Sequence, residues 1–351
     1  MSRVLLFCLL GLSLLLGPDL TFAAAPLKVH AWVNYFPAWL LEAFTKETGV
    51  PVSVTFFADN KDLLRKLREE GDIHRFDIVT PSAEAVQQLV AEKLLTPLAP
   101  ENIPNLKLLD PWFASLPYDK KFSFSAPLFW GGLGIVIDKR VVPDDVSKRI
   151  FGYKDLWMPE LKGILLLPND LRSLMSMMLL YKGYSVNDGD PAHLEAAMEA
   201  LESLAPAVRS FDTVDQIEDL STARLGVGVV WANEVFARPS PPSPFQFVFP
   251  KEGTPMWIDT LAIPANSANA RAAHAFIDFV LRPENLARLG EESGYAVAEK
   301  AAVERLPESL RTNTAVYPLE QLRAKFEPEL MLPPAILGKL EKRWIKLRDK
   351  L

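Results

Sequence analysis

Short apolar runs alternate with longer amphipathic stretches along most of the chain. In the first third, alternating apolar and polar positions predict strands at 27–33, 52–57 and 76–79. Spacing of apolar residues at helical intervals predicts helices at 37–47, 61–69 and 84–91. Strands that alternate with helices are typical of α/β units with largely parallel sheets, so this third is expected to form one α/β lobe.

A comparable set of elements follows Trp130-Gly131-Gly132 and predicts a second lobe. It comprises strands at 163–167, 225–231 and 245–249 and helices at 172–181 and 191–204. A strong strand at 257–263 and a helix at 268–281 come next, and periodicity does not decide which lobe they join. A last helix at 335–351 has one apolar face and basic residues elsewhere, which favours packing over membrane binding.

The N-terminus has the order of a secretory signal peptide. Arg3 precedes an apolar run at 4–16, which is followed by Gly17-Pro18 and by small residues at 23–25. The run is about 13 residues long, whereas a membrane-spanning helix needs roughly 20. The only cysteine, Cys8, lies inside it. We therefore predict a signal peptide at 1–25 and a soluble, periplasmic mature chain without cysteine.

Composition excludes several classes of protein. The chain has 351 residues, of which 49% are hydrophobic, which suits two domains with real cores. Its formal net charge of -6 argues against binding nucleic acid, because phosphates require clustered Lys and Arg. The four histidines are not spaced as metal ligands, and neither His-Glu-x-x-His nor Gly-x-Ser-x-Gly occurs. The sequence thus predicts no metal, no cofactor and no enzyme, although a carboxylate pair of the glycosidase type stays a minor alternative.

Aromatic residues beside polar or acidic ones, near the ends of predicted strands, are the strongest chemical signal. They occur in three segments: 32–37, 231–234 and 257–259. Ligands of α/β proteins bind beyond the carboxyl ends of strands. Tryptophan faces attract cations and carboxylates pair with ammonium groups, so these segments indicate a site for an organic cation. A single tryptophan in such a place is also compatible with ordinary core packing.

These segments belong to a wider resemblance. The sequence resembles the spermidine/putrescine-type periplasmic binding proteins of ABC transporters in motifs that span the mature chain: 32–37, 40–49, 76–82, 155–157, 162–167, 257–266 and 281–283. The resemblance implies a two-lobed periplasmic-binding-protein fold of type II, with α/β lobes joined by crossing strands. It implies lobes at 26–134 plus 258–303 and at 135–257 plus 304–351, which close like a hinge on one solute.

The resemblance also implies a function and partners. In such relatives a polyamine lies across the cleft, between aromatic walls and acids, and ABC permease subunits receive it. The chain is expected to act as a monomer. Two alternatives stay open: a receptor for another cationic or zwitterionic solute, and a sensory protein that signals through a partner.

Carried over position by position, the resemblance implies a set of ligand-binding residues. The set comprises Trp32, Tyr35, Asp170, Trp231, Trp257, Asp259 and Tyr295, with Glu234 as a second anchor. Four positions depart from the family. Asn34 and Ser173 stand where relatives carry acids, while Glu84 and Glu327 are acids at or near positions that are uncharged in relatives.

The departures alter the expected ligand preference. Ser173 and Glu234 favour a diamine such as putrescine over spermidine. Glu84 also suits the first turn of a helix without any ligand, and Asp170 could instead cap the helix that begins near Arg172.

Overall fold

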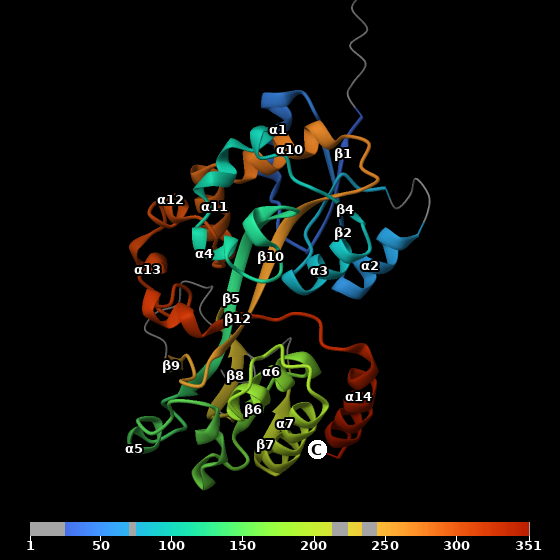
Figure 1. Cartoon of the computed structure of the whole chain (residues 1–351). Helices are drawn as coiled ribbons and strands as arrows, with labels where there is room; N and C mark the ends of the chain where they lie inside the picture. Colours follow the sequence, from blue (N-terminus) through green and yellow to red (C-terminus); the bar gives the residue numbers. More distant parts are fainter. Residues whose placement is uncertain (1–24, 70–74, 213–223, 234–243, 351) are drawn as a thin grey trace, which may run out of the picture.

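The computed structural model describes residues 25–69, 75–212, 224–233 and 244–350. Figure 1 shows two bodies of helices and strands, one above the other, joined by the long strands β5 (Ser125–Asp138) and β10 (Thr254–Pro264). The predicted signal peptide lies outside the described residues except for Ala25. None of the helices within the described ranges has the length and apolar character that a membrane span requires.

The upper body in Figure 1 is formed by two separate stretches of the chain. It begins with β1 (Leu27–Ala31), α1 (Ala38–Thr48), β2 (Val52–Phe56), α2 (Asn60–Arg68), β3 (Ile78–Val79), α3 (Ala83–Ala91), β4 (Leu95–Thr96) and α4 (Pro111–Ala114). It is completed by α10 (Ala270–Val280), α11 (Pro283–Ser293), β11 (Ala296–Val297), α12 (Lys300–Val303) and α13 (Glu308–Arg311). The predicted strands and helices of the first third are thus present, with ends that differ by a few residues.

The lower body is formed by the middle of the chain and by the C-terminal helix. Its elements are α5 (Asp144–Ser147), β6 (Leu165–Leu167), α6 (Leu171–Tyr181), α7 (Pro191–Leu204), β7 (Val208–Phe211), β8 (Val227–Trp231), β9 (Phe245–Val248) and α14 (Pro334–Arg348). Each body has its own hydrophobic cluster, around Phe44 and Phe276 above and around Tyr153 and Met178 below. Two cores of this size agree with the two domains expected from length.

Strand pairing is mixed rather than largely parallel. The described strands follow the order β2-β1-β3-β10-β5-β8-β6-β7. β1 runs parallel to β2 and β3, and β6 runs parallel to β7 and β8. The crossing strands β5 and β10 are antiparallel to each other, and each is antiparallel to the neighbouring strand of one lobe. The antiparallel pair at the centre is therefore shared by both lobes.

The C-terminal part of the chain passes over both lobes. Leu306, Val316 and Phe326 pack in the upper hydrophobic cluster, whereas Leu340 and Trp344 of α14 pack in the lower one. Between them, β12 (Phe326–Pro328) runs parallel to β10. By packing alone, the stretch from 304 to 326 would be grouped with the first lobe rather than with the second, and β12 adds a third crossing.

A glycine in β5 makes room for one of the predicted site residues. Trp257 of β10 lies opposite Gly131 of β5. A Cβ atom on Gly131 would lie only 2.8 Å from the Nε1 atom of Trp257. Glycine is therefore required here for close packing of the indole over the neighbouring strand.

The first lobe contains a buried carboxyl group outside the predicted site. Glu299 is 1% exposed, and both of its carboxylate oxygens lack a hydrogen-bond partner among the described residues. Burial raises the pKa of Glu299 to about 7, and Glu284 adds to this effect while Arg305 opposes it. A carboxyl group whose pKa is higher in the folded chain destabilises the fold as pH rises.

We expect Glu299→Gln to stabilise the protein above neutral pH. The wild-type penalty develops between about pH 4.5 and about pH 7 and amounts to about 3 kcal/mol above that window. Chemical denaturation at pH 5 and pH 8 should therefore show a much larger gain in stability for the variant at pH 8 than at pH 5. Glu304→Gln, at a nearby exposed position, is the control. A variant less stable than wild type at pH 8 contradicts the prediction.

Candidate functional site

Asp259 is the buried acid at the centre of the predicted site. It lies on β10, is 6% exposed, and accepts hydrogen bonds from the hydroxyl groups of Tyr35 and Ser82. Burial raises the pKa of Asp259 to about 6, while Ser82, Tyr35 and Trp32 act in the opposite direction. Asp259 forms no salt bridge within the described ranges of the chain. A carboxylate stabilised by neutral donors alone is suited to pairing with an incoming cation.

Ser82 contributes to this site instead of to its own helix. It occupies the N-cap position of α3 with an extended backbone, yet its side chain makes no capping hydrogen bond. Its hydroxyl group donates to Asp259, and the two residues also form an isolated antiparallel bridge. A serine cap is usually worth about 1 kcal/mol to a helix. This potential cap is instead directed toward the buried carboxylate.

Aromatic rings surround the same carboxylate. Trp257 and Asp259 are two residues apart on β10, and the Trp257 and Tyr295 ring centroids are 5.7 Å apart at 76°. Tyr295 lies 5.5 Å from Phe129, and Tyr35 lies 5.1 Å from Phe129, both in edge-to-face contact. Sequence reasoning did not single out Phe129, whose place opposite Asp259 on β5 follows from strand register. The rings form an apolar wall beside the acid.

Two further tryptophans extend the aromatic surroundings. Trp32 packs on Phe57 with ring centroids 4.5 Å apart, and its indole helps to lower the pKa of Asp259. Trp257 donates from Nε1 to the Asn233 side chain, 3.3 Å away, just after the end of β8. Trp231, at the end of β8, is half-buried. The segment after β8 therefore brings the second lobe to the aromatic wall.

A cavity of about 370 Å³ adjoins the aromatic wall on the first lobe. It is lined by Val33, Asn34, Tyr35, Pro37, Phe129, Leu289, Glu292, Ser293 and Tyr295. Asn34 has a φ of 66°, a left-handed conformation that asparagine tolerates better than most residues. Predicted residues Asn34, Tyr35 and Tyr295 thus share one cavity.

Acidic residues from both lobes approach each other between α3 and α6. Asp170 caps α6 and accepts from the backbone N–H and hydroxyl groups of Ser173 at 2.8 and 2.6 Å. The capping role considered for Asp170 is therefore confirmed. Burial raises the pKa of Glu84 at the start of α3. Arg172 lowers this pKa, whereas Asp170 raises it further. Glu84 of the first lobe is therefore close enough to the start of α6 in the second for the charges there to act on it.

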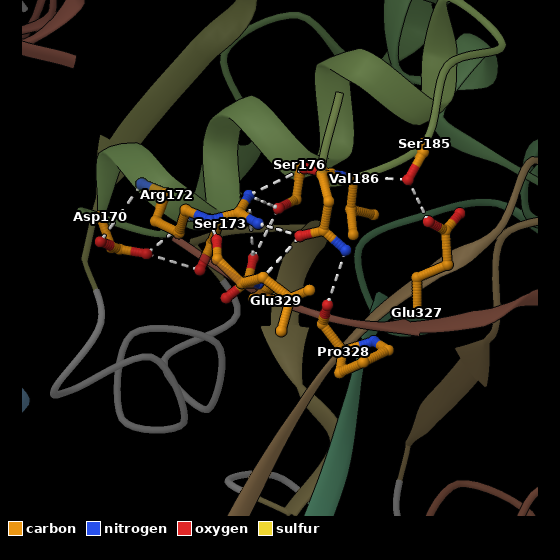
Figure 2. A network of polar contacts seen from close by, with 11 residues as sticks. Asp170, Arg172, Ser173, Ser176, Ser185, Val186, Glu327, Pro328 and Glu329 are labelled. Atoms are coloured by element: carbon orange, nitrogen blue, oxygen red, sulfur yellow. Dashed lines mark hydrogen bonds and ion pairs between the residues drawn. The ribbon is translucent and has the colours of Figure 1, made fainter. Parts of the chain in front are cut away.

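Arg172 and Glu329 form a buried network behind Asp170, as Figure 2 shows. Arg172 donates to the Leu330 carbonyl at 3.0 Å and to the Asn187 side chain at 2.8 Å, and lies 4.0 Å from Glu329. Burial raises the pKa of Glu329 to about 7, against the influence of Arg172. The sequence analysis did not identify Glu329, because its partners are more than 150 residues away.

Glu327 lies at the edge of that network. Its side chain accepts a hydrogen bond from Ser185, and Figure 2 shows it apart from Asp170 and Arg172. Glu234 lies outside the described residues. The structure therefore gathers Trp32, Tyr35, Trp257 and Tyr295 around the carboxylate of Asp259. Glu84 at the start of α3 lies within electrostatic range of Asp170 at the start of α6.

Two α/β lobes that share crossing strands, with a buried acid and aromatic rings at the crossing, define a solute-binding protein of the two-lobed type. The model of the bacterial extracellular solute-binding protein family matches residues 39–316. The chain belongs to this family.

Individual relatives confirm the predicted resemblance and fold class. The spermidine/putrescine-binding periplasmic protein of Salmonella typhimurium is 34% identical over 301 residues, which are 86% of this chain and 85% of that protein. The putrescine-binding periplasmic protein PotF of Escherichia coli is 27% identical over 351 residues, covering 92% and 91% of the two chains.

A solved structure agrees with these sequence matches. The spermidine/putrescine transporter substrate-binding protein PotD of Streptococcus pneumoniae superimposes with a TM-score of 0.83 at 28% identity, over 93% of this chain and 99% of that one. The relatives are named for binding rather than for a reaction.

Proposed function

We propose that this protein is an extracytoplasmic receptor that captures a putrescine-like or spermidine-like polyamine and delivers it to the permease subunits of an ABC importer. The observation that carries the proposal is Asp259, a buried carboxylate that accepts hydrogen bonds from neutral hydroxyl groups beside an aromatic wall. An ammonium group supplies the missing positive charge, and the rings cover the methylenes between its nitrogens.

Each part of the proposed site has a separate task. Asp259 holds one nitrogen, with Trp32, Tyr35, Trp257 and Tyr295 along the alkyl chain. Asp170 and Glu84 attract positive charge from opposite sides of the gap between the lobes, and Trp231 covers the ligand from the second lobe. Asn34, Glu234 and Glu327 complete the set of proposed contacts.

The wider setting is part of the proposal. Residues 1–25 direct export to the periplasm, and the mature chain acts as a monomer and catalyses no reaction. The lobes at 26–134 plus 258–303 and at 135–257 plus 304–351 close on the ligand about the crossing strands. The relatives named above are periplasmic polyamine-binding proteins, which supports this setting.

A thermal-shift screen of the mature chain tests the proposal. Putrescine, cadaverine, spermidine, spermine and agmatine are compared with neutral amino acids and sugars. A ligand at 100 times its Kd stabilises the folded state by about 2.7 kcal/mol, so a true ligand raises the melting temperature clearly. A response to sugars or acidic solutes alone overturns the proposal.

Affinity for the amine is expected to fall in acid. The pKa of Asp259 is raised to about 6, and the ionised form binds the cation. Protonation therefore competes with the ligand, and affinity should drop roughly tenfold per pH unit below that pKa. Between pH 7 and 8 it should change little, because the carboxyl group is ionised and the alkyl amines are charged there. Calorimetry from pH 5 to pH 8 measures this, and constant affinity over that range contradicts it.

A further inference from the structure

The third crossing between the lobes is a short strap, residues 323–330, whose first part is anchored to the first lobe. The Nη1 atom of Arg323 lies 2.6 Å from the Asp110 carboxylate, and its guanidinium lies 5.1 Å from the centre of the Trp112 ring. Phe326 packs in the upper hydrophobic cluster and begins β12, which runs parallel to β10. The strap is therefore fixed to the first lobe before it reaches the second.

Two side chains of the second lobe hold the other end of the strap. Asn187, in the loop between α6 and α7, donates to the Pro328 carbonyl at 2.9 Å and accepts from the Leu330 N–H at 2.8 Å. Arg172 of α6 donates from Nε to the Leu330 carbonyl at 3.0 Å and from Nη2 to the Asn187 side chain at 2.8 Å. These four hydrogen bonds form a clip that engages both backbone polar groups of Leu330.

The guanidinium of Arg172 is bound within the protein and does not serve as a ligand contact. Its Nη1 atom donates to the Ser176 hydroxyl group and to the Val186 carbonyl, and the side chain is only 12% exposed. Figure 2 shows this network, in which Glu329 lies 4.0 Å from the guanidinium and accepts from Ser176. All three nitrogens of Arg172 therefore donate to the second lobe or to the strap.

The clip lies two residues from a proposed ligand-binding acid. Asp170 caps α6 by accepting from the backbone N–H groups of Arg172 and Ser173, so its carboxylate moves with the first turn of the helix. Only a short piece of chain joins Phe326 to Leu330, and an extended chain cannot exceed about 3.3–3.6 Å per residue. Because this piece is held at both ends, the first turn of α6 has little freedom to shift against the first lobe.

We propose that Arg172 and Asn187 are positioning residues of the amine site, and that the clip keeps Asp170 in a fixed position relative to Asp259 of the first lobe. The inference rests on the proposed function, because it requires a ligand that meets both acids. Without the clip, α6 adopts further orientations in which Asp170 misses the ligand. The apparent affinity then falls with the fraction of molecules in the competent arrangement.

Asn187→Ala tests the clip without changing any charge. It removes three of the four clip hydrogen bonds and should weaken the binding of putrescine and of spermidine about fivefold in calorimetry. Asn105→Ala is the matched control, because Asn105 is also half-buried and donates to the Asp278 carbonyl at 3.1 Å within the first lobe. The control should change affinity less than twofold. Equal losses for the two variants overturn the inference.

A double-mutant cycle separates positioning from a general loss of stability. In the Asp170→Asn background, Asn187→Ala should change affinity less than twofold, because the acid that the clip positions has already lost its charge. Additive losses contradict the inference, since they show that the clip acts independently of Asp170. If the wild-type chain binds neither amine, the proposed function fails and the inference fails with it.

Arg172→Lys repeats the test from the other side of the clip. Lysine keeps the positive charge but lacks the planar fork that donates to Leu330 and to Asn187 at once. It should also weaken both amines several-fold, and this loss should likewise disappear in the Asp170→Asn background. Melting temperatures without ligand show that each variant is folded. Wild-type affinity in a folded Arg172→Lys variant removes Arg172 from the inference.

Discussion

Replacing Asp259 with asparagine is expected to weaken polyamine binding by at least a hundredfold. The substitution keeps the shape of the side chain but removes its negative charge, so the ligand ammonium would be buried without a counter-ion. Truncating one partner of a buried charge pair typically costs 2–5 kcal/mol. Isothermal calorimetry at pH 7.5, where the wild-type carboxyl group is ionised, measures the loss directly.

The unliganded Asp259→Asn variant should remain folded. A buried carboxyl group with a raised pKa destabilises the folded chain once it is ionised, and the neutral amide avoids that cost. The melting temperature without ligand should therefore be equal to or above that of wild type at pH 7.5. Binding within threefold of wild type, in a folded variant, would exclude Asp259 from the ammonium site.

Much of the fold could be predicted from sequence because its elements are locally amphipathic. In α1, Leu40 and Phe44 recur at helical spacing, are buried as expected, and precede Gly49, whose φ of 74° ends the helix. The same reasoning identified α6, α7 and β8. Patterns of this kind depend only on residues within one element, which is why a single sequence is sufficient for them.

The long crossing strand β5 was not predicted. Gly131 and Gly132 indicated a boundary between lobes, yet β5 continues through both of them, from Ser125 to Asp138. Glycine often marks a turn, but here its missing side chain admits Trp257 from β10. That role depends on a strand more than 120 residues away in sequence, which no local pattern reveals.

The candidate site likewise contains residues that the sequence could predict and residues that it could not. Asp259 and its aromatic neighbours could be predicted because residue types and the family resemblance point to them. Ser82, Phe129 and Glu329 could not, since each acquires its role through a distant partner: Ser82 through Asp259, Phe129 through strand register, and Glu329 through Arg172 and Ser176. The cavity beside Tyr35 likewise arises only when α11 packs against the loop after β1.

Replacing Trp257 with alanine is expected to weaken polyamine binding by about thirtyfold. The indole lies over Gly131 and contacts Tyr295, so its removal leaves the alkyl chain of the ligand exposed to water along one side. Each buried methylene contributes about 0.8 kcal/mol, and the aromatic face also attracts the ammonium groups. Trp257→Phe should recover part of the loss, because a smaller ring still covers some methylenes.

A second tryptophan provides the control for this effect. Trp157 stacks on Tyr181, at the C-terminal end of α6, whereas Asp170 lies at the N-terminal end of the same helix. Trp157→Ala should lower the melting temperature without changing amine affinity. Trp257→Ala should lower the amine affinity strongly and the melting temperature only slightly. The ratio of affinity loss to stability loss therefore separates a ligand wall from a structural ring. Equal ratios for the two variants would assign Trp257 to packing alone and leave the charge on Asp259 to account for binding.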